Sequence, residues 1–288
     1  MTTLYNPYDR FDDALQRAFE GNLLAALLED VGTGDLTGEL VPDDVRVRAR
    51  VIVREDAVLC GGNWFEGIML AMDRSIEISW QFSEGDLMTA GSVVCTIEAP
   101  PRALLTAERS ALNFLQLLSG VATATRRYVD VIAGTKAAIL DTRKTLPGLR
   151  LAQKYAVRVG GGQNQRMALY DGILIKENHI AAAGGVAKAM QAALALNAGV
   201  SIQIEVENLA QLREALEAGA KSVLLDNFEL PLMREAVAVN AGRALLEASG
   251  GVNLDSVRAI AETGVDRISI GSLTKDVRAT DYSLRIID

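Results

Sequence analysis

Two periodicities of apolar residues divide the chain. Apolar residues recur at helical spacing between residues 11 and 27, which predicts an amphipathic helix over Asp12–Leu28. Beyond it, short runs of alternating or β-branched residues separated by glycine and acidic turns predict strands, and a helix over Asn63–Met72 is expected to cover one face of their sheet. The first part therefore reads as a small mixed domain on an antiparallel sheet. Its predicted strands are Val45–Val53, Ser75–Trp80 and Ser92–Ala99.

After Gly134, apolar strands and amphipathic helices alternate. A helix over Thr106–Asp130, with a break expected at Gly120, connects the two parts of the chain. The later helices are predicted to span roughly 10–14 residues, and the strands recur about every 22 residues, which favours a parallel barrel over an open doubly wound sheet. We therefore expect an α/β fold. The predicted strands are Ala137–Leu140, Gly172–Ile175, Ile202–Val206, Ser222–Leu225, Ala244–Glu247 and Arg267–Ile270.

Charge is distributed unevenly along the sequence. The net charge is −8, which argues against a general nucleic-acid partner or an anionic membrane surface. Between Arg102 and Lys176, however, twelve Lys and Arg residues face four Asp and Glu residues, a local balance of +8 that leaves −16 for the remainder. This asymmetry favours a small, highly anionic ligand; solvated helix faces are the alternative interpretation.

The rarer residue types exclude several kinds of site. The single histidine, His179, excludes a zinc site of the HExxH type; we expect it in a loop, where it either bonds to a carboxylate or caps the next helix. Cys60 and Cys95 read as two buried small side chains. No apolar run approaches the roughly 18 residues needed to cross a bilayer, and the first residues lack a signal-like core, so we expect a cytoplasmic protein.

Polar residues that follow the predicted barrel strands are the candidates for chemistry, because active sites of such barrels lie at the carboxyl ends of the strands. The first strand ends carry cations, and one more cation ends the glycine-rich loop that begins at Val159. Guanidinium and ammonium groups together suit a ligand with adjacent carboxylates. Ion pairing with Asp141, Asp171 or Glu177 is the structural alternative. The candidate cations are Arg143, Lys144, Arg166 and Lys176.

The later strand ends carry carboxylates and small residues. Glu205 and Asp226 are suited to ribose hydroxyls or a hydrated Mg²⁺, or else to salt bridges with the cations. The Ser249-Gly250-Gly251 turn precedes a helix predicted to start near Asn253, and Gly271-Ser272 follows the last strand. Both turns lie where barrels bind phosphate, although plain turns have the same composition.

Five runs of this sequence are more specific than any short motif: Glu29–Thr37, Glu108–Gly120, Asp141–Ile180, Leu225–Phe228 and Glu247–Val252. Together they resemble one family, quinolinate phosphoribosyltransferase. The resemblance covers nearly the whole chain, and the central run of forty residues is its most specific part. It implies an N-terminal α/β sandwich domain over residues 1–118, including the N-terminal helix, and an open TIM-like α/β barrel over residues 119–288, whose C-terminal tail packs back on the first domain.

The resemblance also implies an activity and partners. A pentosyltransferase of this family converts quinolinate and phosphoribosyl pyrophosphate to nicotinate mononucleotide, pyrophosphate and CO₂ in NAD biosynthesis. It requires Mg²⁺, held mainly through the substrate, and it forms a head-to-tail homodimer with shared active sites. Neither nucleic acid nor a membrane is an expected partner.

Residue roles follow from the same resemblance. The four cations are expected to bind the quinolinate carboxylates, with Arg109 reaching them from the partner subunit. The phosphoribosyl pyrophosphate ligands are expected to be Glu205, Asp226, Ser249, Gly250 and Gly271, with Glu205 and Asp226 also available to the metal. The catalytic residues are expected to be Lys144, Glu205 and Asp226.

Three positions depart from the pattern of the family. Relatives commonly carry His at the position of Gln165, and we expect an acidic residue in place of Gln203 and a basic one in place of Asp276; the last two positions read as peripheral. Glutamine can donate a hydrogen bond but cannot be charged. A protein that binds quinolinate without catalysis is therefore one rival hypothesis. The others are a related enzyme for another base and, more distantly, an aldolase with a Schiff base at Lys176.

Overall fold

The computed structural model describes residues 2–8, 11–42 and 45–287. Their contacts group the chain into two compact units. Unit 1 consists of Met1–Arg126, Thr145–Gly161 and Thr274–Asp288, and unit 2 consists of Arg127–Lys144 and Gly162–Leu273. Neither unit is a single continuous segment, and the sequence boundary predicted after residue 118 falls inside helix α3 (Pro101–Val131). The C-terminal residues belong to unit 1.

Unit 1 is built on an antiparallel sheet with the strand order β12-β1-β5-β3. Burial alternates along β1 (Val47–Val53), as expected for a strand with one face against a core. The C-terminal strand β12 (Tyr282–Ile286) pairs with β1, so residues more than 200 positions apart share this sheet. The other strands of unit 1 are β5 (Val93–Ala99), β3 (Glu77–Trp80) and the short pair β2 (Ala57–Val58) and β4 (Leu87–Met88).

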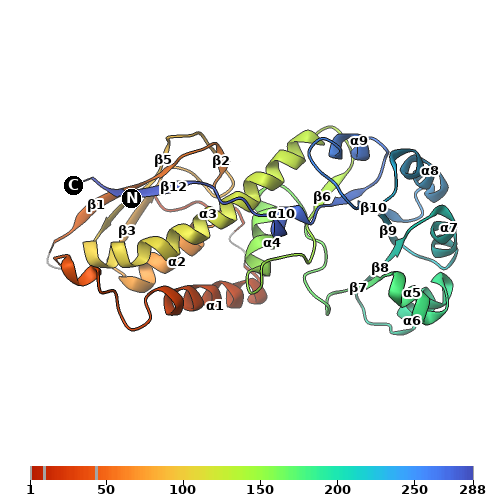
Figure 1. The fold of residues 1–288 in the computed structure, drawn as a ribbon, viewed down its shortest axis with the longest axis horizontal. Coiled ribbons are helices and arrows are strands. Elements are labelled where there is room, and N and C mark those ends of the chain that lie inside the picture. Colours follow the sequence, from red (N-terminus) through yellow and green to blue (C-terminus); the bar gives the residue numbers. More distant parts are fainter. Residues whose placement is uncertain (1, 9–10, 43–44, 288) are drawn as a thin grey trace. The chain divides into compact units, whose positions relative to one another are not determined.

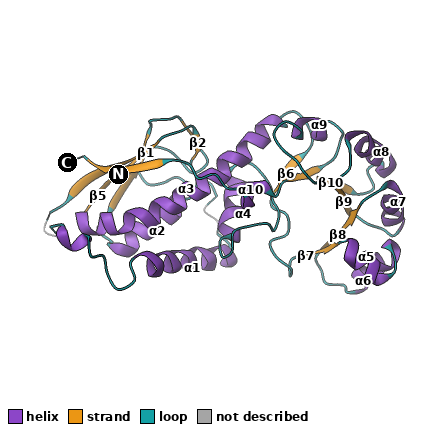
Figure 2. Ribbon diagram, viewed as in Figure 1, coloured by secondary structure: helices purple, strands orange, loops and turns teal. Residues whose placement is uncertain are grey.

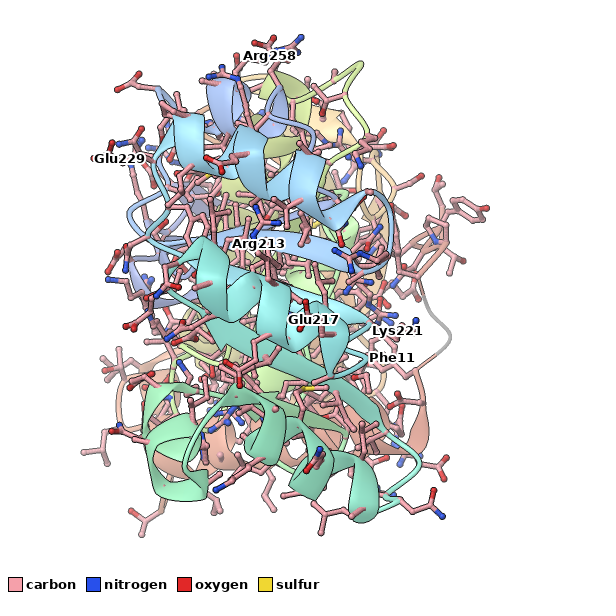
Figure 3. The ribbon with its side chains drawn as sticks, turned by 90° about the vertical axis from the view of Figure 1, so that its right-hand side faces the viewer. Phe11, Arg213, Glu217, Lys221, Glu229 and Arg258 are labelled. Atoms are coloured by element: carbon pink, nitrogen blue, oxygen red, sulfur yellow. The ribbon has the colours of Figure 1, made fainter. Side chains whose placement is uncertain are left out.

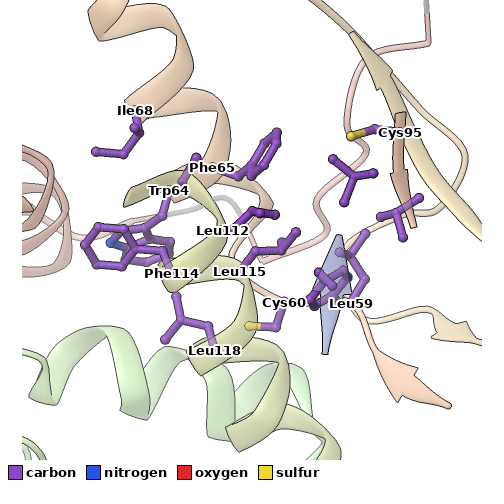
Figure 4. Close-up of a cluster of buried hydrophobic side chains, with 14 of the residues drawn as sticks. Leu59, Cys60, Trp64, Phe65, Ile68, Cys95, Leu112, Phe114, Leu115 and Leu118 are labelled. Carbon is purple, nitrogen blue, oxygen red and sulfur yellow. The ribbon is translucent and has the colours of Figure 1, made fainter. Parts of the chain in front are cut away.

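Helices cover the sheet of unit 1 and enclose an apolar core (Figure 4). Asp12 caps the N-terminus of helix α1 (Asp13–Asp30), because its carboxylate accepts from the backbone N–H of Leu15 at 2.8 Å. The remaining helices of this unit are η1 (Gly38–Leu40), α2 (Gly62–Met72), α3 and α4 (Arg150–Val159). Cys60 and Cys95 are both buried free thiols, as the sequence predicted.

Helix α3 is continuous through Gly120, so the prediction of a break there is wrong. The backbone of the C-terminal segment passes directly over this residue: a Cβ atom at Gly120 would collide with the carbonyl oxygen of Arg278. Nearby, the backbone N–H of Thr280 donates to the carbonyl of Gln116 at 3.0 Å. Glycine is required for close approach of two backbone segments and not for a change of direction.

Unit 2 carries a parallel sheet with the order β6-β11-β10-β9-β8-β7 (Figures 1 and 2). The first and last strands of this order, β6 (Ala138–Leu140) and β7 (Gly172–Ile175), are not paired with each other, so the six-stranded barrel is open. The segment at Gln163 adds one parallel bridge to Leu140. The intervening strands are β8 (Ser201–Val206), β9 (Ser222–Asp226), β10 (Leu245–Ser249) and β11 (Arg267–Ser269).

The helices of unit 2 lie on the outside of this sheet and expose charged side chains, among them Arg213 and Glu217 of α7 (Figure 3). None of the helices within the described residues is long and apolar enough to span a membrane. The helices of unit 2 are α5 (Glu177–Ala183), α6 (Val186–Ala195), α7 (Leu209–Glu217), α8 (Leu230–Asn240) and α9 (Val257–Ala261). The short α10 (Ser272–Lys275) follows β11.

Two local predictions about this unit are wrong. The helix expected near Asn253 begins only at Val257 and has five residues, because Asn253 instead organises a turn in which its side chain accepts from the N–H groups of Asp255 and Ser256. His179 lies inside α5 and not in a loop. Its Nδ1 accepts from the backbone N–H of Lys176 at 3.0 Å, so the imidazole caps its own helix.

Candidate active site

Alternate residues of the parallel strands point into the open barrel. Parallel strands place every second side chain on the same face, and the strand register aligns these positions across the sheet. We call the last inward-facing residues at these carboxyl ends the rim; they are Lys176, Glu205, Asp226 and Ser249. The inward-facing residues that precede them are Leu174, Gln203, Leu224 and Glu247, and Ser269 faces inward on β11. The register places Glu205 and Glu247 beside Leu224, and Ser249 beside Asp226.

A cavity of about 340 Å³ lies at this end of the barrel. Its volume is in the range of small-molecule sites. The walls combine a cationic side with an acidic and hydroxyl side, and all four predicted carboxylate-binding cations belong to them. The predicted site residues that line it are Arg143, Lys144, Arg166, Lys176, Glu205 and Ser249.

Two guanidinium groups face the same cavity from different loops. Arg143 follows β6, and its Nε is buried without a hydrogen-bond partner among the described residues. Burial and the positive charge of Arg143 lower the pKa of Arg166, with an opposing contribution from Asp171. Like charges held this close are stabilised by an anion placed between them. The pair therefore favours a ligand with more than one negative charge.

The ammonium group of Lys176 forms an ion pair with Glu205, with Nζ and Oε2 3.0 Å apart. The salt bridge that was the structural alternative for Glu205 is thus observed. Burial raises the pKa of the Glu205 carboxyl, while the hydrogen bond from Lys176 opposes that shift. The amino group of Lys176 is engaged by this carboxylate, which does not favour a Schiff-base role.

The remaining predicted phosphate and ribose ligands surround the same strand ends. Asp226 pairs in register with Ser249 across β9 and β10. Gly250 and Gly251 follow with φ values of 102° and 59°, a conformation that L side chains rarely adopt. A Cβ atom at Gly271 would lie 3.1 Å from the Lys144 side chain. All of these residues belong to unit 2, so their proximity is intrinsic to that unit.

The loop that carries Arg166 is held by a buried carboxylate. Asp141, which is fully buried, accepts from Asn164 Nδ2 at 2.6 Å and from the backbone N–H of Gln165 at 2.9 Å. Asp171 similarly accepts from the backbone N–H groups of Met167 and Ala168. Both acidic residues thus organise the loop on which the cation sits.

The prediction that Gln203 is peripheral is wrong. Its side chain is 5% exposed and hydrogen-bonds to Gln165 at 2.6 Å and to Glu247 at 2.9 Å. The sequence predicted Glu247 only as the last residue of a strand, whereas the structure places it in the lining of the cavity. Both residues could have been placed inside the barrel from the sequence, because inward-facing side chains alternate along β8 and β10. Asp276, in contrast, lies in unit 1 in an exposed ion pair with Lys275.

Arg109 belongs to unit 1 and lies on α3, where its side chain is exposed. Within the described residues, no cluster of three or more histidine, cysteine, aspartate or glutamate side chains could hold a metal ion. Among the four rim residues, the carboxylates are Glu205 and Asp226. Any cation at this rim must take most of its ligands from substrate and water.

The fold and the cavity define a class of protein: an α/β barrel protein with a cationic cavity and glycine turns at the same strand ends. Comparison with known proteins specifies the family. The chain matches the family model of the quinolinate phosphoribosyl transferase N-terminal domain over residues 35–119 and that of its C-terminal domain over residues 121–285. The chain therefore belongs to the quinolinate phosphoribosyltransferase family, which confirms the resemblance seen in the sequence.

Relatives agree over nearly the full length. A probable carboxylating nicotinate-nucleotide pyrophosphorylase of Bacillus subtilis (strain 168) is 40% identical over 260 residues, 90% of each chain. The carboxylating enzyme of Mycobacterium leprae is 39% identical over 288 residues, 96% of this chain and 97% of its own. The nicotinate-nucleotide pyrophosphorylase structure from Francisella tularensis superposes with a TM-score of 0.92 at 41% identity, covering 100% of both chains. The predictions of an enzyme, a pentosyltransferase, and of a two-domain α/β fold are confirmed.

A more distant likeness shows the fold alone. The structure of human nicotinic acid phosphoribosyltransferase has a TM-score of 0.62 at 12% identity. At this identity the likeness shows that the architecture is shared and nothing about function.

Proposed function

We propose that the cavity of unit 2 binds quinolinate and phosphoribosyl pyrophosphate and converts them to nicotinate mononucleotide, pyrophosphate and CO₂. The single observation that carries the proposal is the convergence of four cations on one cavity at the carboxyl ends of the barrel strands. Two adjacent carboxylates on a pyridine ring match the paired guanidinium groups of Arg143 and Arg166. Lys144 and Lys176 add point charges around them.

The phosphoribosyl group is proposed to lie on the opposite wall. Glu205 and Asp226 accept hydrogen bonds from the ribose hydroxyls. The backbone N–H groups around Gly250 and Gly271, with the Ser249 hydroxyl, hold the phosphate, because glycine lets the backbone approach an anion closely. Lys144 lies beside Gly271, and its charge therefore serves both substrates.

The residues present fit a Mg²⁺ ion that is held mainly by substrate. Glu205 and Asp226 are close enough that the charge of Asp226 contributes to raising the pKa of Glu205, after the larger effect of burial. Two carboxylates with phosphate oxygens are a common environment for this ion. When bound, the ion would neutralise charge on the leaving pyrophosphate, and Glu205 and Asp226 would hold it.

In the proposed mechanism, the cations hold the pyridine nitrogen against C1 of the ribose. The nitrogen lone pair forms the new C–N bond as the bond from C1 to the pyrophosphate oxygen breaks. Glu205 and Asp226 stabilise the positive charge that develops on the sugar. The pyridinium nitrogen then accepts electron density as the 2-carboxylate leaves as CO₂, and the electron pair left at C2 takes up a proton. Lys144 contributes by positioning and by its charge.

Product formation tests this function. Purified protein incubated with quinolinate, phosphoribosyl pyrophosphate and Mg²⁺ is expected to form nicotinate mononucleotide, detected by mass. Binding of quinolinate without release of pyrophosphate would instead support a non-catalytic protein, and product from nicotinate in place of quinolinate would support the rival enzyme for another base. Incorporation after borohydride treatment would support the Schiff-base alternative at Lys176.

Removal of divalent cations is expected to reduce turnover by at least about 100-fold, because charge on the leaving pyrophosphate would no longer be neutralised. Product formation is measured after exhaustive chelation and after Mg²⁺ is added back. Quinolinate binding, measured by calorimetry without phosphoribosyl pyrophosphate, should be unchanged, since the carboxylate-binding residues are cations. Turnover that survives chelation, or quinolinate binding that is lost with the metal, would contradict this assignment.

We further propose a homodimer in which Arg109 completes the quinolinate site of its partner. The proposal rests on the family resemblance and on the exposed position of Arg109. A cytoplasmic location is proposed with it, because reducing conditions keep thiols such as those of Cys60 and Cys95 free.

Subunit mixing tests the placement of Arg109. The variants Arg109→Ala and Lys144→Ala are each expected to be nearly inactive alone. When equal amounts are unfolded and refolded together, half of the dimers are mixed and each mixed dimer has one intact site, so about a quarter of wild-type activity should return. If Arg109 acts within its own subunit, no mixed dimer has an intact site and activity stays absent. Wild-type protein taken through the same procedure is the control.

A further inference from the structure

Three side chains form a continuous hydrogen-bonded row: Gln165 from the loop before β7, Gln203 on β8 and Glu247 on β10. Gln165 Nε2 lies 2.6 Å from Gln203 Oε1, and Gln203 Nε2 lies 2.9 Å from Glu247 Oε2. Gln203 and Glu247 are 5% and 1% exposed. Gln165 and Glu247 line the same cavity as the four cations. The row therefore connects the buried Gln203 to two residues that line the site already described, Gln165 and Glu247.

The direction of this row is fixed by its partners. Gln203 Nε2 donates to Glu247 and also to Ser222 Oγ at 3.2 Å, so both of its N–H bonds are used. Its Oε1 is left as the acceptor, and Gln165 must present its amide nitrogen to it. The oxygen of Gln165 in turn accepts from the backbone N–H of Arg166 at 2.6 Å. Rotating either amide by 180° would set donors against donors, so each orientation depends on the other.

Glu247 is the acceptor on which the row ends. Its Oε1 is buried without a hydrogen-bond partner among the described residues. Burial raises the pKa of this carboxyl, and the hydrogen bond from Gln203 opposes that shift. A second negative charge beside it would be strongly unfavourable, since two buried carboxylates cannot both ionise at short range. A neutral side chain at position 203 is thus required as long as position 165 is also neutral.

We propose that Gln203 and Glu247 are positioning residues that hold Gln165 as a neutral hydrogen-bond donor toward a quinolinate carboxylate, so that the identities of residues 165 and 203 are coupled. This inference rests on the proposed quinolinate site. It explains the two departures of this chain as one change: two amides replace an imidazole and a carboxylate and preserve the donor–acceptor direction. Gln165 then belongs to an active enzyme and is no mark of lost catalysis.

Four variants test the coupling. Gln203→Glu alone places two carboxyl groups together and is expected to raise KM for quinolinate roughly 10- to 100-fold with a smaller change in kcat. Gln165→His alone is expected to raise KM several-fold. In the double variant, the imidazolium pairs with the new carboxylate, and KM should fall below that of Gln203→Glu. Gln203→Met, which removes both amide ends at similar volume, should also raise KM about 10-fold.

Controls separate this inference from its premise. Gln191→Glu, on the exposed surface of α6, is the matched charge change and should leave KM unchanged. Arg143→Met reports on the site itself: if it leaves KM for quinolinate unchanged, the proposed site is wrong. If Arg143→Met raises KM but the effects of Gln165→His and Gln203→Glu simply multiply, the coupling is wrong. Where Gln203→Glu does not fold, an unchanged KM in Gln203→Met overturns the positioning role.

Discussion

Replacing Arg143 with methionine is expected to raise KM for quinolinate by roughly 100- to 1,000-fold, with a smaller effect on kcat. A guanidinium group that grips a carboxylate makes two charged hydrogen bonds, each worth about 1.5–3 kcal/mol, and methionine preserves much of the volume while removing both. Arg143 lines the cavity together with Lys144, Arg166 and Lys176, so its side chain lies where a carboxylate of quinolinate is proposed to bind. Steady-state kinetics with varied quinolinate at saturating phosphoribosyl pyrophosphate measures the effect.

Arg258→Met provides the matched control for this experiment. Arg258 lies on α9 of the same unit, exposed, in an i,i+4 ion pair with Glu262 at 2.7 Å (Figure 3). Such surface pairs contribute about 0.3–0.5 kcal/mol to stability, so the control should keep wild-type kinetics. A KM for quinolinate within about threefold of wild type in Arg143→Met would remove this arginine from the site.

Replacing Glu84 with alanine is expected to lower the free energy of unfolding by roughly 3–5 kcal/mol. This carboxylate is 2% exposed in unit 1. It accepts from the backbone N–H groups of Gly61 at 2.7 Å and Gly62 at 3.2 Å and from the hydroxyl of Tyr155 at 2.9 Å. Alanine leaves these buried donors without their acceptor and creates a cavity. Urea unfolding monitored by fluorescence measures the loss.

Glu20→Ala is the control for the stability measurement, since Glu20 is exposed on α1 and accepts a hydrogen bond from the Gln16 side chain at 2.7 Å. It should change the free energy of unfolding by no more than about 0.5 kcal/mol. A loss below about 1 kcal/mol in Glu84→Ala would show that the three donors find other partners.

The pH dependence of stability gives Glu84 a second signature. Burial raises its pKa above the ordinary value of 4.5, with the hydrogen bonds from Gly61 and Tyr155 opposing the shift. The folded protein therefore holds this proton more tightly than the unfolded chain does. The resulting stabilisation is present below pH 4.5 and is lost as the pH rises through the raised pKa. Wild type should thus lose stability over that range more steeply than Glu84→Gln.

The sequence alone determined the elements of the barrel and the cations that line its cavity. The strand Gly172–Ile175 was predicted with its observed bounds. Four others differ by one residue at one end, and β10 differs by one residue at its start and two at its end. The agreement is good because buried parallel strands are short apolar runs between polar loops. The cations at the strand ends were visible for the same reason. Arg143 and Lys176 are the first long polar side chains after an apolar run, and topology places all strand ends at one edge.

Only the tertiary structure decided which residues meet across long separations. Nothing local in Gly120 distinguishes a helix break from a close backbone contact, since the collision partner, Arg278, lies more than 150 positions away. Gln203 could be placed on the inner face of its strand by alternation, but its partner Gln165 lies 38 positions earlier in an irregular loop. Periodicity specifies the face that a side chain occupies. The neighbour it meets there depends on how distant segments are packed, and therefore on the whole fold.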